Sequence, residues 1–323
     1  MEAMVQERYG EAEHVLRLAP INRPEIGDGD VLVRVHAAGL DRGVWHVTAG
    51  LPYPVRLVSG IRAPKARVPG TDVAGRVEAV GRDVATLRVG DDVFGTADGS
   101  FAEYARARQD TLVPKPKSLS FEQAAAVPVS ACTALQAVRD RGRVQPGRKV
   151  LIIGASGGVG TFAVQIAKAY GAHVTGVCST AKLDLVRSIG ADHVIDYTHD
   201  DISDGRQRYD VILDIGGNRS LRTLRHALTP RGTLVITGGE TGGRWLGGTD
   251  RQLRAMALSP FIGQKLGTFI GTQNAADLLV IAGLIDAGKV TPVIDRTYPL
   301  DEVPTAIRYL QDGHARGKVV ITI

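Results

Sequence analysis

Cysteine is scarce in this chain of 323 residues, which contains only Cys132 and Cys178. A disulfide framework needs several paired cysteines, so this count argues against one and is typical of a reducing compartment. The opening segment MEAMVQERYG lacks a basic head followed by an apolar core, and no apolar run reaches the length of a membrane span. We therefore expect a cytoplasmic protein that does not bind a membrane.

No block of charge of one sign stands out either. Lys and Arg total 39 against 34 for Asp and Glu, and the two kinds are interleaved along the chain. No basic run carries the interspersed aromatic residues that are typical of a nucleic-acid-binding surface. We expect no dedicated nucleic-acid site, although the net charge of +5 would assist the capture of a polyanionic cofactor.

The length of the chain predicts two domains, because it exceeds the size at which single cores usually stop growing. Short strand-like runs closed by glycine fill the first part, among them DVLVRVHAAGL, VAGRVEAVG and GDDVFGT, and they are typical of a small β-barrel. Ser120 is then expected to cap an alanine-rich helix. We predict a first domain of residues 1–122 and 273–323, and a second of residues 123–272.

The second domain has the alternating pattern of a parallel α/β sheet. Helices are expected near 158–170, 181–189 and 219–227, between apolar runs that suit strands buried on both faces. GTFIG, at 267–271, is a candidate sixth strand at the edge, where a second copy of the chain would pair to form a homodimer. The predicted core strands are VLIIGA, HVTGVCS, DHVIDY, YDVILDIGG and GTLVITGGE.

The stretch KVLIIGASGGVG, residues 149–160, leads a short apolar run directly into a glycine-rich turn. Read from Ala155, it matches the dinucleotide-binding pattern with alanine in place of the first glycine. Gly157 would let the backbone approach a pyrophosphate, and Gly160 would let the following helix pack closely. The positive end of that helix would face the anion. The predicted contacts here are Ala155, Ser156, Gly157, Gly158, Val159 and Gly160.

The residues after the second predicted strand, HVTGVCS, indicate which dinucleotide fits. An NAD site places Asp or Glu about twenty residues beyond the fingerprint to hold the ribose 2′-hydroxyl. This chain has Ser179, Thr180 and Lys182 there instead. A carboxylate would repel a 2′-phosphate, whereas hydroxyl groups and an ammonium group would bind it. We therefore predict NADPH as the cofactor, although such a lysine is also typical of a solvated helix start.

Several motifs in a fixed order resemble the medium-chain dehydrogenase/reductase superfamily, and within it the zinc-lacking branch that is similar to quinone oxidoreductases and enoyl reductases. The resemblance runs over essentially the whole chain. It implies a GroES-like β-barrel domain, a doubly wound Rossmann domain of strand order 3-2-1-4-5-6, and a nicotinamide in the cleft between them. The motifs are AAGLDRGVWHVTAG, VPGTDVAGRVEAVG, VGDDVFG, GSFAEYA, the glycine fingerprint, GADHVIDY and GHARGKVVITI.

The departures from zinc-dependent alcohol dehydrogenases bear on the mechanism. Those relatives place a cysteine ligand near Gly39 to Asp41, a His-Glu pair where this chain has Thr71 and Asp72, and a four-cysteine loop before the Rossmann domain. None of these thiols is present in the sequence, and His36 and His46 show no recognisable partner ligands. We expect no catalytic metal. An activated alkene or a quinone accepts hydride more readily without a Lewis acid than a plain ketone does.

The resemblance also implies the roles of individual residues. Tyr53, in GLPYP, matches the family's tyrosine near the nicotinamide and is a candidate hydrogen-bond or proton donor, or else an aromatic that packs on its loop. Asp41 stands where many relatives carry Asn, at the family's usual substrate contact. We take both as candidate catalytic residues. The implied cofactor contacts outside the glycine turn are Thr133, Ser179, Lys182, Tyr197, Asp214, Gly216, Thr237, Gly238 and Lys318.

Taken together, these patterns predict an NADPH-dependent enzyme that transfers hydride to an enone or a quinone without zinc. Two alternatives stay open: a zinc-free enzyme acting on ordinary carbonyls or alcohols in a biosynthetic pathway, and a nucleotide-binding protein with a regulatory or RNA-binding role and little turnover. The physiological substrate, the proton donor and the direction of reaction are not determined. Substrate specificity is expected in the segments 56–67 and 241–266, because binding specificity tends to reside in long loops.

Replacing Lys182 by alanine tests the choice of cofactor. We expect the dissociation constant for NADPH to rise by about tenfold or more, because a charge-assisted contact with the 2′-phosphate is lost. The dissociation constant for NADH should stay nearly unchanged, since NADH carries no such phosphate. Calorimetric titration with both nucleotides measures the difference, and equal weakening of both would show that Lys182 has another role.

Overall fold

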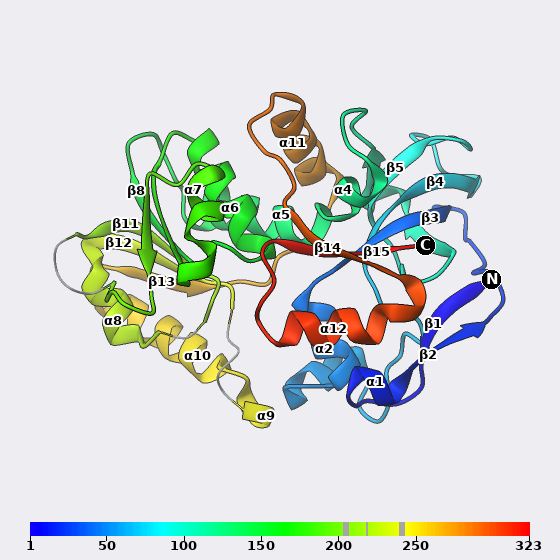
Figure 1. Cartoon of the computed structure of the whole chain (residues 1–323), viewed down its shortest axis with the longest axis horizontal. Coiled ribbons are helices and arrows are strands. Elements are labelled where there is room, and N and C mark those ends of the chain that lie inside the picture. Colours follow the sequence, from blue (N-terminus) through cyan, green and yellow to red (C-terminus); the bar gives the residue numbers. More distant parts are fainter. Residues whose placement is uncertain (203–206, 218, 239–242) are drawn as a thin grey trace. The chain divides into compact units, whose positions relative to one another are not determined.

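Two compact units make up the chain, and each has its own sheet (Figure 1). The computed structural model describes residues 1–202, 207–217, 219–238 and 243–323. The first unit comprises Met1–Cys132, Thr272–Ala287 and Pro292–Ile323, and the second comprises Thr133–Gly271 and Gly288–Thr291.

A seven-stranded sheet forms the frame of the first unit, in the order β14-β15-β3-β4-β5-β7 with β6 also paired to β3. A separate two-stranded ladder joins β1 and β2. Near the end of the chain, β15 runs antiparallel to β3, so the closing segment is part of this sheet. The strands are β1 (Glu2–Gln6), β2 (Leu16–Pro20), β3 (Asp30–Leu40), β4 (Asp72–Val80), β5 (Asp92–Thr96), β6 (Tyr104–Arg108), β7 (Leu112–Pro114), β14 (Ile294–Pro299) and β15 (Lys318–Thr322).

Alternate residues of the strands fill the core of this sheet. Val31, Val33 and Val35 of β3 pack with Val73 and Val77 of β4 in one buried cluster, because successive side chains of a strand point to opposite faces. The short helical segments of the first unit lie between these strands. They are α1 (Ala12–Val15), α2 (Arg42–Ala49), η1 (Tyr53–Val55), α3 (Arg56–Ser59), η2 (Gln109–Thr111), α4 (Phe121–Ala125), α11 (Ala275–Asp286), η6 (Leu300–Glu302) and α12 (Val303–Gln311).

The predicted cap of the helix after residue 120 is confirmed. The hydroxyl of Ser120 accepts a hydrogen bond from the amide of Gln123, and the Gln123 side chain accepts one from the amide of Ser120. This reciprocal capping box satisfies two amides that a helix start otherwise leaves unpaired.

The division between the units falls at Cys132 and Thr133, ten residues after the end of the predicted first segment at 122. The reason is local packing: α4 lies on β3 and β4, and the amide of Val129 donates a 2.8 Å hydrogen bond to Oδ1 of Asp72 on β4. The next helix, α5 (Pro128–Gln136), therefore begins in the first unit and ends in the second.

The second unit contains a six-stranded parallel sheet in the order β10-β9-β8-β11-β12-β13. Numbered from β8, this is the order 3-2-1-4-5-6, so the predicted doubly wound Rossmann fold is confirmed. The last two residues of GTLVITGGE lie outside the described residues. The strands are β8 (Lys149–Ile153), β9 (His173–Cys178), β10 (His193–Asp196), β11 (Tyr209–Asp214), β12 (Leu228–Ile236) and β13 (Lys265–Thr268).

The central strands of this sheet are covered on both faces. Val150, Leu151 and Ile152 are consecutive residues of β8, and all three are buried. Since successive side chains of a strand point to opposite faces, both faces of the sheet must be covered here. The apolar runs of the sequence therefore predicted the right strands. The helical segments of the unit are η3 (Ala137–Arg141), α6 (Gly158–Ala169), η4 (Thr180–Lys182), α7 (Leu183–Ser188), α8 (Leu221–Ala227), α9 (Gly243–Leu246), α10 (Thr249–Leu258) and η5 (Ser259–Phe261).

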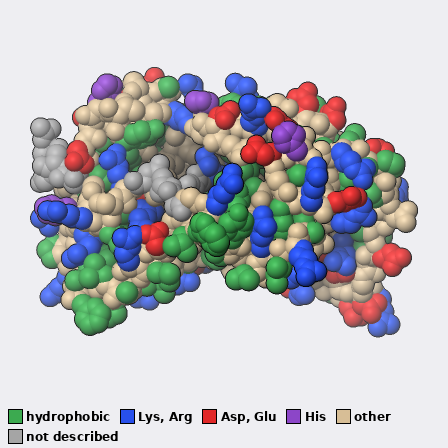
Figure 2. Space-filling view, turned by 90° about the horizontal axis from the view of Figure 1, so that it is seen from below, with side chains coloured by type: hydrophobic (Ala, Val, Ile, Leu, Met, Phe, Trp, Pro, Cys, Tyr) green, Lys and Arg blue, Asp and Glu red, His purple; other side chains and the backbone are tan. Residues whose placement is uncertain are grey.

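Two surface features bear on partners. In the described part of the sheet β13 pairs only with β12, so the homodimer through this edge stays a prediction. Lys and Arg side chains are scattered over the face that Figure 2 shows, with acidic side chains among them. None of the helices formed by the described residues is long and apolar enough to cross a membrane.

Candidate functional site

The turn between β8 and α6 leaves its outer surface open to a ligand. Gly157 is the N-cap of α6, and a Cβ atom built on it would meet only the carbonyl oxygen of Gly154, at 3.5 Å. A Cβ atom on Gly160 would instead lie 2.0 Å from that same oxygen. Glycine at 160 is therefore required for the helix to pack on the turn, whereas glycine at 157 keeps space free above it.

The first amides of α6 are available to an anion. Gly157 has no side chain, and no described side chain caps the helix. The amides of Gly158, Val159 and Gly160 are the first three of the helix, and such amides have no acceptor within a helix. These amides lie at the positive end of the helix dipole. The turn thus fits a pyrophosphate group, which binds to backbone amides at the start of a helix.

The predicted residues Ala155 and Ser156 lie in the same turn but are buried. The amide of Ala155 donates to the carbonyl oxygen of Val177 on β9, at 3.1 Å. That amide is therefore already used in joining the turn to the neighbouring strand. Ala155 thus joins the turn to β9, and contacts of Ala155 and Ser156 with the cofactor stay predictions.

The ends of β8 and β11 meet where the strand order reverses, and this is the crevice in which doubly wound folds bind ligands. The amides of Ile215 and Gly216 both donate 3.0 Å hydrogen bonds to the carbonyl oxygen of Ile153. A Cβ atom on Gly154 would lie 2.9 Å from the amide nitrogen of Gly216. The predicted contact Gly216 therefore packs directly against the glycine turn.

Hydroxyl groups surround the end of β9, where we predict the ribose phosphate. Ser179 is the N-cap of η4, and Lys182 ends that helical turn with its side chain partly exposed. Tyr197 follows β10, with 53% of its surface exposed, and its amide donates to the carbonyl oxygen of Cys178 at 3.1 Å. The structure thus brings Ser179, Lys182 and Tyr197 to one edge of the sheet.

Asp196, at the end of β10, is a neighbour of this group that sequence reasoning missed. Its carboxylate accepts hydrogen bonds from the hydroxyls of Thr180 and Thr198 and, at 3.0 Å, from the Thr198 amide. The two side-chain hydrogen bonds are the main cause of its lowered pKa. Burial, with the nearby charge of Asp196, raises the pKa of the Cys178 thiol to about 11, so this cysteine is inert at neutral pH.

The carboxylate of Asp214, a predicted cofactor contact, binds groups within the second unit, and its contact with the cofactor stays a prediction. The side chain is fully buried, and its oxygen Oδ2 lies 2.5 Å from Nη1 of Arg251 on α10. The other carboxylate oxygen accepts a 3.1 Å hydrogen bond from the amide of Gly217. Burial raises the pKa of Asp214 and the Arg251 charge opposes that rise. Nothing in the sequence around Asp214 indicated a basic partner 37 residues away.

Lys318, another predicted cofactor contact, is likewise buried, and that contact also stays a prediction. Its ammonium lies 3.0 Å from Oδ2 of Asp72, and the two side chains are 1% and 0% exposed. Desolvation raises the pKa of Asp72 to about 6 although Lys318 opposes the shift. The ammonium is used within the first unit, between β15 and β4.

The two candidate catalytic residues have identifiable structural roles. Asp41 is the N-cap of α2, and its oxygen Oδ1 accepts hydrogen bonds from the amides of Gly43 and Val44 at 2.7 and 3.3 Å. Tyr53 begins η1, and the guanidinium carbon of Arg56 lies 5.0 Å from its ring centroid. The same guanidinium lies 4.7 Å from the ring of Tyr9. Catalytic roles for Asp41 and Tyr53 stay predictions.

The remaining predicted contacts lie in the second unit. Thr133, on α5, is partly exposed, and a Cβ atom on Gly271 would lie 2.4 Å from its hydroxyl oxygen. Thr237 and Gly238 follow β12, and both amides donate to the carbonyl oxygen of Asp214, at 3.0 and 3.3 Å. These three residues remain predicted cofactor contacts.

The histidines that we considered as metal ligands have other partners. His36 stacks on Phe121 with ring centroids 4.3 Å apart, and its pKa is lowered chiefly by burial. Nδ1 of His46 lies 2.7 Å from the carbonyl oxygen of Leu51. Within the described ranges, no group of three or more His, Cys, Asp or Glu side chains is arranged to hold a metal ion.

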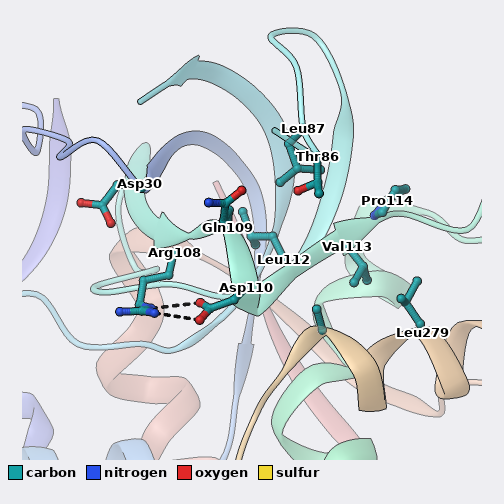
Figure 3. A pocket seen from close by; sticks show the side chains of 12 residues that line it. Asp30, Thr86, Leu87, Arg108, Gln109, Asp110, Leu112, Val113, Pro114 and Leu279 are labelled. Carbon is teal, nitrogen blue, oxygen red and sulfur yellow. Dashed lines mark hydrogen bonds and ion pairs between the residues drawn. The ribbon is translucent and has the colours of Figure 1, made fainter. Parts of the chain in front are cut away.

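A pocket of about 650 Å³ opens in the first unit along β7 and α11 (Figure 3). Arg108 and Asp110, which line the pocket, form a bidentate ion pair, with nitrogen to oxygen distances of 2.9 and 2.7 Å. None of the predicted site residues lines this pocket, and we assign it no part in the nucleotide site. It is lined by Gly29, Asp30, Thr86, Leu87, Arg108, Gln109, Asp110, Leu112, Val113, Pro114, Ala275 and Leu279.

Comparison with known proteins gives matches over the whole chain. Residues 27–117 match the alcohol dehydrogenase GroES-like domain, and residues 189–321 match the family described as zinc-binding dehydrogenase. The mitochondrial NAD(P)H oxidoreductase RTN4IP1 of Mus musculus is 34% identical, with 100% of this chain and 89% of that protein covered.

Two further relatives are similar to nearly the whole of this chain, one in sequence and one in structure. The chloroplastic NADPH-dependent alkenal/one oxidoreductase of Arabidopsis thaliana is 33% identical, with 99% of this chain and 79% of that protein covered. The solved structure of the quinone oxidoreductase from Coxiella burnetii has a TM-score of 0.88 at 28% identity, covering 100% of this chain and 99% of that chain.

Gly157→Ala tests the open space above α6. The added methyl group meets no protein atom closer than 3.5 Å, so the variant should fold, yet it stands where a pyrophosphate would approach. We expect the dissociation constants for NADPH and NADH both to rise by about tenfold, which corresponds to about 1.4 kcal/mol. Fluorescence titration measures both. Gly283→Ala is the matched control, because its methyl group meets no atom within 4 Å.

Lys318→Met tests the buried pair. The variant leaves the Asp72 charge buried without its base, and we expect the free energy of unfolding at pH 7 to fall by about 3–5 kcal/mol. Asp72→Asn/Lys318→Met removes both charges and should lose less. Denaturant unfolding measures the difference, and equal losses in the single and double variants would contradict this account.

The same pair predicts how stability depends on pH. The pKa of Asp72 is raised from 3.8 to about 6, so its ionisation costs stability as the pH rises through that window. Loss of Lys318 raises the pKa of the buried carboxyl further, so the deficit of Lys318→Met relative to the parent should shrink as the pH falls toward about 6, the pKa of Asp72 in the parent. Unfolding of this variant and of the double variant at several pH values tests the sign.

Proposed function

The chain belongs to the medium-chain dehydrogenase/reductase superfamily, in its quinone oxidoreductase-like branch, and within this family of nicotinamide-dependent oxidoreductases we propose that it reduces an activated alkene or a quinone with NADPH, without zinc. The observation that carries the proposal is the uncapped start of α6, where glycine at 157 leaves room above the first helical amides. These amides and the helix dipole would hold the pyrophosphate of the cofactor.

The preference for NADPH rests on the residues that follow β9. Ser179 and Lys182 stand where an NAD site has a carboxylate, and Lys182 offers a cation to a 2′-phosphate. The nearby carboxylate of Asp196 accepts hydrogen bonds from Thr180 and Thr198, which reduces its repulsion toward an added phosphate. The printed name of the related Arabidopsis thaliana enzyme, which is NADPH-dependent, supports the same choice.

Three residues of the first unit support the proposal of a mechanism without zinc. A Cβ atom on Gly39 would lie 2.4 Å from the carbonyl oxygen of Ala125 and 2.6 Å from Oδ2 of Asp72, so no cysteine ligand fits at this position. Asp72, which stands in place of a family metal ligand, binds Lys318 and the amide of Val129 with its two oxygens. The carboxylate that could serve as a metal ligand in place of the missing cysteine is therefore already bound within the protein.

An activated alkene suits such a site because its carbonyl oxygen takes up the charge. When bound, NADPH supplies a hydride. Hydride addition at the β-carbon moves an electron pair to the carbonyl oxygen, and a proton from a donor completes the product at the α-carbon. Tyr53 is our candidate for the group that donates a hydrogen bond to the oxygen. Arg56, which lies against its ring and donates to the carbonyl oxygen of Gly50 at 2.9 Å, would hold Tyr53 in place.

Steady-state oxidation of NADPH with a panel of quinones, enones and saturated aldehydes tests the proposal. We expect turnover with enones or quinones that exceeds turnover with aldehydes by at least tenfold, and no loss of activity after exhaustive treatment with a chelator. Tyr53→Phe should lower kcat with a smaller effect on the Kd of NADPH, because the phenol acts on the substrate. Turnover confined to aldehydes, or tight NADPH binding with no turnover at all, would overturn the proposal.

A further inference from the structure

Arg251 connects loops that follow two different strands of the Rossmann sheet. It lies on α10, and its side chain is only 12% exposed. Its terminal nitrogens donate three hydrogen bonds: to Oδ2 of Asp214 at 2.5 Å, to the carbonyl oxygen of Arg219 at 2.9 Å and to that of Gly238 at 3.1 Å. A single guanidinium thus binds the loop after β11 and the loop after β12.

Asp214 extends this connection to the backbone. Its carboxylate accepts from the amide of Gly217, and its carbonyl oxygen accepts from the amides of Thr237 and Gly238. The residue is fully buried at the end of β11. Arg251 and Asp214 together therefore determine where the chain turns after both strands.

The same network reaches the glycine turn. Ile215 and Gly216 follow Asp214 directly, and their amides bind the carbonyl oxygen of Ile153, the last residue of β8. Gly216 in turn packs against Gly154 of the turn. A continuous series of contacts thus runs from the guanidinium of Arg251 to the crevice between β8 and β11, where we propose that the nucleotide binds.

The chemistry of the pair favours a positioning role over a stabilising one. Removing two charges from water costs about as much as their attraction returns, so a buried ion pair is weak evidence for stability. A planar guanidinium, however, can bind several oxygens in fixed directions, which a lysine cannot do. Among the described residues Nε of Arg251 is buried with no hydrogen-bond partner, so one donor of this group is left unused.

We propose that Arg251 is a positioning residue for the cofactor: it holds the loops 215–217 and 237–238 in the conformation that binds the nicotinamide dinucleotide. The inference rests on the proposed function and extends it to a residue outside the glycine fingerprint. Since these loops contain none of the predicted 2′-phosphate contacts, Arg251 serves NADPH and NADH equally.

Three variants separate positioning from stability. Arg251→Lys keeps a positive charge near Asp214 but loses the hydrogen bond that the second terminal nitrogen of Arg251 donates to the carbonyl oxygen of Gly238. Arg251→Gln/Asp214→Asn removes both charges, so no buried carboxylate is left without a base and the fold is kept. Arg254→Gln is the matched control on the same helix, because Arg254 is 72% exposed and its ion-pair partner among the described residues is Asp250, one turn away.

Calorimetric titration with NADPH and NADH and thermal unfolding are measured for each variant. We expect Arg251→Gln/Asp214→Asn to unfold within a few degrees of the parent while both dissociation constants rise about tenfold, and Arg251→Lys to show a smaller rise of the same kind. Arg254→Gln should match the parent in every measurement. The equal effect on both nucleotides distinguishes Arg251 from Lys182, whose replacement should affect NADPH alone.

Three results would overturn the inference in distinguishable ways. If the parent binds NADPH and turns over enones or quinones, but the double variant binds both nucleotides as the parent does, the role of Arg251 is disproved and the proposed function stands. If the parent binds neither nucleotide, the proposed function and the inference fail together. Affinity that falls only in proportion to thermal stability across all variants would show that Arg251 is merely structural.

Discussion

The close approach of α6 to the turn after β8 is the contact on which the nucleotide site depends. Any side chain at Gly160 would collide with the carbonyl oxygen of Gly154, so the helix can lie this near the strand only with glycine there. The same geometry leaves Gly157 as an N-cap without a side chain. The first amides of the helix are consequently uncapped, and they lie at the positive end of the helix dipole.

Each unit contains a fully buried acid whose base comes from a distant segment. Asp214 binds Arg251 in the second unit, and Asp72 binds Lys318 in the first. Neither pair is expected to add much net stability, because desolvation offsets the attraction. Both instead determine where separate segments meet, at the ends of β11 and β12 in one unit and between β4 and β15 in the other. These pairs therefore determine local geometry more than they add stability.

The pair in the first unit also bears on the chemistry without a metal that we propose. In the first unit Asp72 binds Lys318, and a side chain at Gly39 would collide with the carbonyl oxygen of Ala125, so a thiol does not fit there. The two candidate catalytic residues of this unit are a helix-capping carboxylate, Asp41, and a phenol, Tyr53, whose ring lies against Arg56. Such a set suits substrates whose own carbonyl oxygen accommodates the developing charge.

Local sequence was sufficient to predict the buried strands, the glycine turn and the cap at Ser120, because each depends on neighbouring residues, whereas the strand order was implied by the family resemblance. Apolar runs mark buried strands, glycine permits a close approach, and a serine caps the helix that follows it. Asp214 and Lys318, by contrast, were assigned to the cofactor by position alone, and each proved to be bound by a residue far away in the chain. Whether a charged side chain faces a ligand or an internal partner depends on which distant segment packs against it, and only the tertiary structure decides that.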